Sequence, residues 1–189
     1  MARAGPTDGR VQVRRWGRET ALADDDEARR RLIDAAGRCI VARGGVHFRM
    51  GEVADEAGVS RSTLYRYFES RDDLVMGLII SRVDTALEAA RQSLPAPAHA
   101  ADSLPELILQ PLDLVAGNPL NEALFSPESG PVVTVLQLRS ERLMDVICSY
   151  YGPLLEEWKL SGQLAPDLDV REALRWMNAI SLMLLSPLA

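Results

Sequence analysis

Apolar residues recur at three- and four-residue spacing in several segments that glycine and proline separate, and this pattern predicts amphipathic α-helices. The first helix follows the acidic run 24–27, because acidic side chains stabilise a helix start. Its apolar face includes Leu32 and Ile40, and Gly44-Gly45 ends it. Cys39 lies on the same face, which indicates a core residue and not a nucleophile.

Two short helices joined by a tight turn are predicted next, between residues 50 and 68. The first has its apolar residues on one face, and Gly58 then supplies a turn position where positive φ costs little. Ser60 is a natural N-cap for the second helix. Leu64 and Phe68 lie on one side of that helix, whereas polar and aromatic residues lie largely on the other. This arrangement indicates a helix-turn-helix.

The residues of this motif resemble the signature of the TetR family of bacterial repressors. The resemblance covers residues 25–76 and rests on Val53-Ala54-x-x-Ala57-Gly58-Val59-Ser60-x-x-Thr63-Leu64-Tyr65-x-Tyr67-Phe68, followed by Ser70-Arg71-Asp72-Asp73-Leu74. It implies a three-helix DNA-binding domain, a long fourth helix and an all-helical ligand-binding domain. It also implies a homodimer that binds a near-palindromic operator in double-stranded DNA.

The same resemblance implies a set of DNA-contacting residues around the second short helix. They are Arg49, Ser60, Arg61, Ser62, Thr63, Tyr65, Arg66, Tyr67 and Arg71. The first turn of the helix should approach base edges, and the tyrosines and Arg71 should approach phosphates. Gly51 stands where some members carry a base-contacting side chain. Surface solvation of Arg61 and partial core packing of Tyr67 are the alternatives.

The second half of the chain predicts further helices. A long helix runs from 71 to about 94, a helix over 103–117 is kinked at Pro111, and one helix covers 132–151. The last helix begins after Asp169 and is apolar nearly all round from 176 to 185, so its own core and a second subunit should cover it. Family members usually end with two such helices and one is evident here, so either a segment is missing or the dimer uses another helix pair.

Charge is distributed unevenly along the chain. Residues 1–71 carry 14 arginines and 11 acidic residues, whereas residues 72–189 carry 7 basic and 16 acidic residues, for a net charge of −6. A basic front half suggests one end that meets a polyanion. The segment 1–23 contains five arginines and no hydrophobic periodicity, which indicates a flexible arm that either touches DNA or is a disordered tail.

No enzyme motif is present. His47 and His99 are the only histidines, and Cys39 and Cys148 form no CxxC pair, so we expect no catalytic residue, no metal site and no cofactor. The cysteine usage fits the reducing cytoplasm, and no apolar stretch is long enough to span a membrane.

The sequence therefore predicts an all-α transcriptional repressor released from its operator by a small, mainly apolar ligand. Its parts are the arm 1–23, a helix-turn-helix domain over 24–70 and a ligand-binding and dimerisation domain over 71–189. The candidate ligand-binding residues are Phe125, Leu136, Tyr150, Trp158, Trp176 and Met177. Plain core packing of these side chains is the alternative. A DNA-binding factor without a small ligand is the alternative function, and an enzyme is a weaker one.

Overall fold

The computed structural model describes residues 21–93, 99–115 and 117–185. Nine α-helices and no strands lie within them, which confirms the all-α prediction. The helices are α1 (Ala21–Arg43), α2 (Met50–Ala57), α3 (Arg61–Tyr67), α4 (Arg71–Ser93), α5 (Ala100–Val115), α6 (Pro119–Leu124), α7 (Gly130–Arg139), α8 (Glu141–Leu160) and α9 (Val170–Leu185). The predicted arm lies outside the described residues, except that residues 21–23 form the start of α1.

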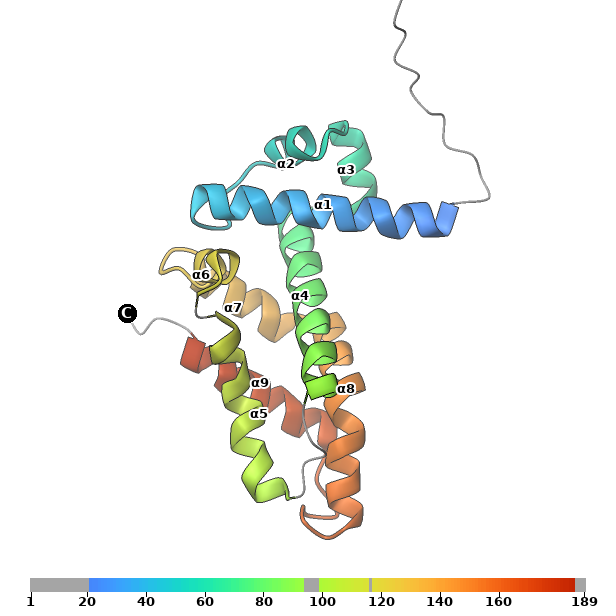
Figure 1. Cartoon of the computed structure of the whole chain (residues 1–189), viewed down its shortest axis with the longest axis vertical. Helices are drawn as coiled ribbons and strands as arrows, with labels where there is room; N and C mark the ends of the chain where they lie inside the picture. The colour runs from blue at the N-terminus through green and yellow to red at the C-terminus, as the bar shows by residue number, and fades with distance from the viewer. Residues whose placement is uncertain (1–20, 94–98, 116, 186–189) are drawn as a thin grey trace, which may run out of the picture.

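Helices α1–α3 form a small unit, called here the head, and α5–α9 form a second unit, called the body. Figure 1 shows α1 lying across the start of α4, with α2 and α3 on the far side of α1. Helix α4 leaves the head and runs down into the body, where it contacts α7 and α8. Helix α6 lies beneath α1 and contacts it, so two helices outside the head touch α1.

The helix-turn-helix forms as its residues predict. Gly58 ends α2 with a φ of +68°, which is the left-handed region that glycine adopts without strain. Ser60 caps α3, because its Oγ accepts a hydrogen bond from the Thr63 N–H at 3.1 Å. Leu64 and Phe68 are fully buried and hold α3 to the rest of the head.

The first half of α4 is enclosed on every side. Ser70 caps the helix by accepting from the Asp73 N–H at 3.1 Å, and residues 74–79 are then buried without interruption. Six consecutive helical residues point in all directions around the axis, so the head and the body must together cover them. Gly77 allows the closest approach, because a Cβ at that position would lie 2.8 Å from Cε1 of the buried Phe68 ring.

The helix predicted over 132–151 is wrong in one respect, because the structure divides it at Ser140. Ser140 ends α7 in an extended conformation, and its Oγ accepts from the Leu143 N–H at 3.1 Å to start α8. Serine offers the backbone this alternative to a continuous helix. By contrast, α5 and α8 continue through the prolines inside them. Helix α9 begins after Asp169 as predicted, and Asp169 Oδ1 caps it by accepting from the Glu172 N–H at 3.0 Å.

One apolar surface of the body stays uncovered in the single chain. It is called here the α7–α9 face, and it consists of Val132, Val135, Leu138, Trp176, Ile180, Met183 and Leu184. The two helices contact each other, and Trp176 and Met183 are 64% and 67% exposed. The opposite side of α9 is buried through Leu174 and Leu182. Helix α9 is thus apolar on both sides, although this chain covers only one.

We predict opposite effects for two Gly→Ala changes inside helices. Alanine at either site gains up to about 1 kcal/mol of helix propensity. At Gly77 the new methyl group overlaps the Phe68 ring, and overpacking costs about 1–3 kcal/mol, so Gly77→Ala should lower the free energy of unfolding. At Gly37 the nearest atom, Leu78 Cδ1, is 3.4 Å away, so Gly37→Ala should be neutral or stabilising. Urea denaturation at equal protein concentration measures both; equal stability of the two variants would contradict the packing at Gly77.

Candidate DNA interface and ligand cavity

The exposed first turn of α3 carries a connected set of hydroxyl groups. Ser60 Oγ lies 2.8 Å from Ser62 Oγ and 2.9 Å from Thr63 Oγ1, and Ser60 also caps the helix. These bonds fix the side chains at the helix start before any partner arrives. The turn therefore presents polar groups in a defined arrangement on the surface of the head, on the side of α1 away from the body.

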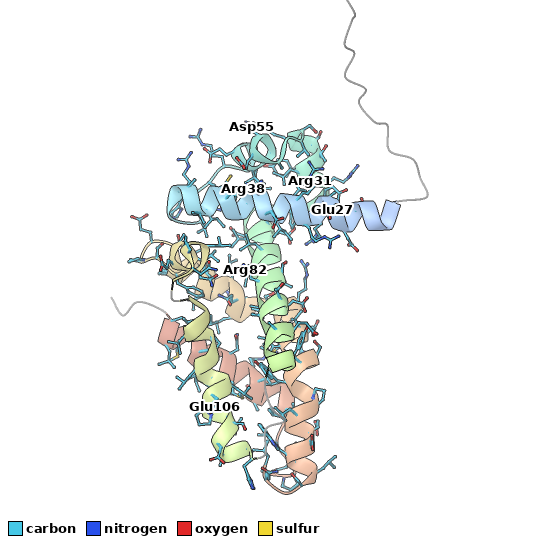
Figure 2. The ribbon with its side chains drawn as sticks, viewed as in Figure 1. Glu27, Arg31, Arg38, Asp55, Arg82 and Glu106 are labelled. Atoms are coloured by element: carbon cyan, nitrogen blue, oxygen red, sulfur yellow. The ribbon has the colours of Figure 1, made fainter. Side chains whose placement is uncertain are left out.

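The arginines of the helix-turn-helix differ in their pairing from those at the end of α1. Arg38 pairs with Glu56 at 2.6 Å and Arg43 pairs with Glu52, so the basic residues near the end of α1 neutralise two of the three acids of α2. Arg49, Arg61 and Arg66 are exposed and have no ion-pair partner among the described residues. Figure 2 shows Arg31 and Arg38 on α1 and Asp55 on α2 at this end of the molecule. The uncompensated positive charge of the helix-turn-helix thus lies beside α3.

Arg61 lies across the start of α2. A Cβ at Gly51 would come within 2.5, 2.7 and 2.8 Å of its guanidinium atoms, and Gly51 itself is buried. The sequence marked Gly51 as the loss of a contact residue, whereas the structure shows that the missing side chain makes room for Arg61. No pattern within the motif signalled this pairing, because it depends on how α2 and α3 pack.

The two tyrosines of α3 differ in their surroundings. Tyr65 is 50% exposed, and its hydroxyl has no hydrogen-bond partner among the described residues. The Tyr67 hydroxyl donates to Asp25 Oδ1 at 2.7 Å and accepts from Arg66 at 2.9 Å. The bond to the Asp25 carboxylate raises the pKa of Tyr67 above its ordinary value, so the phenol stays protonated at neutral pH. Tyr67 joins α3 to α1, and its ring packs against the core.

Arg71 begins α4 and has only a long contact with the neighbouring carboxylate, 3.5 Å from Asp72 Oδ1. Two residues on, Asp73 accepts from Arg142 of α8 at 3.4 Å, a link between the body and the junction of head and α4. A second link is buried, because Ser129, between α6 and α7, accepts from the Val46 N–H at 3.0 Å. The head is therefore connected to the body at α4 and at the α6–α7 junction.

A cavity of about 270 Å³ lies inside the body, and its walls come from α4 through α9. Most of its lining is apolar. The lining residues are Ile79, Arg82, Val83, Ala86, Leu87, Leu107, Pro111, Asn118, Asn121, Leu124, Phe125, Gln137, Ile147, Tyr151, Leu174, Met177, Asn178, Ser181, Leu182 and Leu185. Burial raises the pKa of Tyr151 to about 12, so this wall residue is neutral at physiological pH. A mostly apolar hollow with a few polar groups is typical of small-molecule sites.

Comparison with known proteins gives this geometry a context. The sequence pattern described as "Bacterial regulatory proteins, tetR family" matches residues 32–77. The chain is 26% identical over 151 residues to the "Fatty acid metabolism regulator protein" of Bacillus subtilis, an alignment that spans 75% of this chain and 73% of that protein. It is also 26% identical over 168 residues to the "HTH-type transcriptional repressor BepR" of Brucella suis, spanning 84% of this chain and 78% of that protein.

A solved structure shares the fold. The R. erythropolis transcriptional repressor QsdR from the TetR family superposes with a TM-score of 0.61 at 21% sequence identity, covering 82% of this chain and 79% of QsdR. The matched pattern contains the helix-turn-helix, and the structural likeness extends through the body. The chain belongs to the TetR family. It is a transcriptional regulator, and regulators of this family bind operator DNA.

The relatives of this TetR-family regulator are transcriptional regulators and not enzymes, which agrees with the sequence prediction. Burial raises the pKa of both cysteine thiols, so Cys39 and Cys148 are protonated at neutral pH and are poor nucleophiles. Within residues 21–93, 99–115 and 117–185, no group of His, Cys, Asp and Glu could hold a metal ion. No helix in these ranges combines the length and hydrophobicity of a membrane span.

The residues suggested from sequence as ligand contacts of this regulator do not all gather in one place. Phe125 and Met177 line the cavity. Trp158 is buried in the core away from the lining, and the Tyr150 hydroxyl donates to Asp84 Oδ1 at 3.1 Å. Leu136 also lies outside the lining, and Trp176 points outward on the α7–α9 face. Among the polar wall residues, sequence reasoning missed Arg82 and Gln137, since nothing in their local pattern marks them.

Proposed function

We propose that this regulator is a dimeric repressor that leaves its operator when a small molecule occupies the cavity in the body. One observation carries the proposal: the cavity is walled by α4 and α6, and these same helices pack against α1 of the head. A change in either helix on ligand binding is therefore transmitted directly to the head. The repressor named among the relatives, BepR, supports the choice of repression.

The DNA-binding surface that we propose is centred on α3. Arg61, Ser62 and Thr63 occupy its exposed first turn and would read base edges in the major groove. Tyr65 and Arg71 lie at the borders of this surface and would contact phosphates. We also assign Arg49, Ser60 and Arg66 to phosphate contacts or to holding the turn in place. The uncompensated charge of three of these arginines supplies the attraction to a polyanion.

Tyr67 has a different role in this proposal. Its hydroxyl already donates to a carboxylate, so a phosphate would have to displace Asp25 to reach it. The ring also lies under the Arg66 guanidinium, 4.9 Å from it. Tyr67 then acts by fixing the position of Arg66 and by holding α1 against α3. Of the nine residues predicted to contact DNA, Tyr67 is thus the one that we least expect to bind a phosphate.

A second copy of the chain is the occupant that we propose for the α7–α9 face. Monomeric proteins rarely leave a contiguous apolar surface of several large side chains in water. A two-fold axis through this face would present two heads on one side of the dimer. Recognition helices in such dimers lie about 34–36 Å apart, one turn of DNA, and therefore bind a near-palindromic site.

Ligand binding and DNA binding are coupled in this proposal through α4 and α6. Helix α4 contributes cavity wall residues between Ile79 and Leu87, and the segment 74–79, which overlaps the start of this wall, is enclosed between head and body. Helix α6 contributes Leu124, and its Leu120 side chain lies 3.5 Å from where a Cβ at Gly37 of α1 would be. The alternative, a DNA-binding factor without a ligand, leaves the cavity unexplained. A coupling of about 1–3 kcal/mol is typical of such systems.

The roles of two arginines can be separated by DNA-binding titrations. Operator duplexes are selected from a random pool and compared with scrambled duplexes at several salt concentrations. Arg71→Ala should weaken binding to both duplexes alike. It should also reduce the slope of log affinity against log salt concentration by about one per protomer. Arg61→Ala should reduce the difference in binding free energy between the operator duplex and the scrambled duplex by about 1–3 kcal/mol. Arg139→Ala, an exposed arginine of α7, is the control. If the two variants change the affinities for operator and scrambled DNA in the same way, the assignment of these roles is incorrect.

Substitutions on the α7–α9 face should convert the dimer into monomers. Trp176→Glu combined with Met183→Glu introduces charges that would be desolvated in the interface. Leu160→Glu is the matched control, because Leu160 is 89% exposed at the end of α8 and lies outside the face. Analytical ultracentrifugation should show dimers for the wild type and the control but monomers for the double variant. A wild-type monomer at micromolar concentration would refute the proposed dimer.

A compound that occupies the cavity should weaken operator binding by about 5–150-fold. Candidates are found by thermal shift, because a ligand that binds only the folded chain raises its melting temperature. Ala86→Phe provides the control, since this wall residue of α4 would fill part of the cavity and should abolish the thermal shift. A compound that saturates the body and leaves operator affinity unchanged would exclude ligand-controlled release.

A further inference from the structure

The cavity wall contains a single charged side chain among the described residues that line it. Arg82 comes from the middle of α4, and Figure 2 shows it on the side of that helix that faces α6 and α7. It has no ion-pair partner within the described part of the chain, unlike Arg38, Arg43 and Arg142. The side chain is exposed, so it lies where the cavity opens to solvent. A lone guanidinium at the opening favours an anion there.

A second donor at the wall has no partner. Gln137 of α7 is 93% buried, with a relative exposure of 7%, and its Nε2 is buried without a hydrogen bond. A buried donor left unsatisfied is costly, and such groups in native proteins call for an explanation. Because Gln137 lines the cavity, a hydrogen-bond acceptor on a bound molecule would remove this cost.

Two other polar groups of the wall already have structural roles. Ser181 Oγ donates to the Ile108 carbonyl at 2.7 Å and so ties α9 to α5. Asn118 Oδ1 accepts from the Leu120 N–H at 3.1 Å and caps α6. By contrast, Arg82 and Gln137 are both donors, and neither is engaged by the described residues. Asn178 also lines the cavity and offers both a donor and an acceptor, so the Arg82 guanidinium is the one charged group, and Gln137 Nε2 the one buried unsatisfied donor, that the described lining presents to a ligand.

Building on the proposed function, we infer that the ligand is an amphipathic carboxylate. Its oxygen atoms meet the Arg82 guanidinium and the Gln137 amide, which come from two helices that contact each other. Its apolar part packs against Leu107, Ile147 and Leu174. A dry cavity of about 150 Å³ accommodates benzene, so about 270 Å³ holds a molecule of roughly a dozen non-hydrogen atoms.

Charge decides between the chemical classes of ligand. A cationic amphiphile would place like charge beside Arg82. A neutral one of the same shape would fill the apolar part and leave the guanidinium without a counter-charge. Because Arg82 is exposed, water and salt screen its attraction, so the preference for a carboxylate is expected to be moderate and to fall with ionic strength.

Direct binding measurements test this inference on the full chain. Calorimetry compares octanoate, decanoate and dodecanoate with 1-decanol and decylamine. Each compound is kept below its critical micelle concentration or, for the alcohol, below its solubility limit. We expect a carboxylate to bind about tenfold more tightly than the alcohol and more tightly than the amine. Arg82→Met should remove this preference while leaving alcohol binding intact, which shows that the cavity has kept its shape. Gln137→Leu should also weaken carboxylate binding.

Two further variants serve as controls. Arg82→Lys keeps the positive charge and should retain part of the preference. Arg139→Met removes the same charge from an exposed site on α7 outside the cavity lining and should change nothing. The inference is overturned if the alcohol or amine binds as tightly as every carboxylate, if Arg82→Met keeps the wild-type preference, or if no carboxylate binds.

Operator release distinguishes this inference from the function on which it rests. If carboxylates bind with the expected dependence on Arg82 but operator affinity does not change, the ligand class is correct and ligand-controlled release is not. If the alcohol alone binds and releases the operator, release is correct and the carboxylate assignment is not. The two proposals thus fail separately.

Discussion

The enclosure of α4 is the constraint on which the rest of the structure depends. Residues 74–79 are buried on every side, so this segment has to satisfy the packing of the head and of the body at once. The contact between Gly77 and Phe68 sets how closely the head approaches, and the Arg29 guanidinium lies over that ring, 4.3 Å from its centre. Because packed interiors have few voids, a displacement of α4 in the body has to move its contacts in the head.

Charge in the head is arranged to leave one surface unneutralised. Glu52 and Glu56 of α2 are paired by arginines of α1, and Asp25 accepts a hydrogen bond from Tyr67. Within the helix-turn-helix, Arg49, Arg61 and Arg66 remain exposed and have no acidic partner in the described chain. Exposed ion pairs such as those between α1 and α2 contribute little to stability. Their main effect is to decide which surface of the head keeps a positive electrostatic potential. An acidic chain can thus carry a locally basic surface that suits a polyanion.

Several features of this protein follow from the sequence alone, because they depend on neighbours in the chain. The helix-turn-helix is local: Gly58 turns the backbone, Ser60 caps α3, and Leu64 and Phe68 face inward at helical spacing. The caps at Ser70 and Asp169 are equally local, and the structure has both. The apolar residues on all sides of the last helix also predicted correctly that one chain would leave part of it exposed.

Tertiary structure decided what depends on contacts between distant segments. The break at Ser140, the position of Arg61 over Gly51 and the link of Tyr67 to Asp25 each require a particular packing or a choice between competing hydrogen bonds. The cavity shows the difference most clearly. Aromatic residues such as Trp158 and Trp176 are of types common in binding sites, but they lie in the core or on the surface, whereas Arg82 and Gln137 both line the cavity. Periodicity shows which face of a helix is apolar, but only the packing of six helices determines which polar groups are left without a partner.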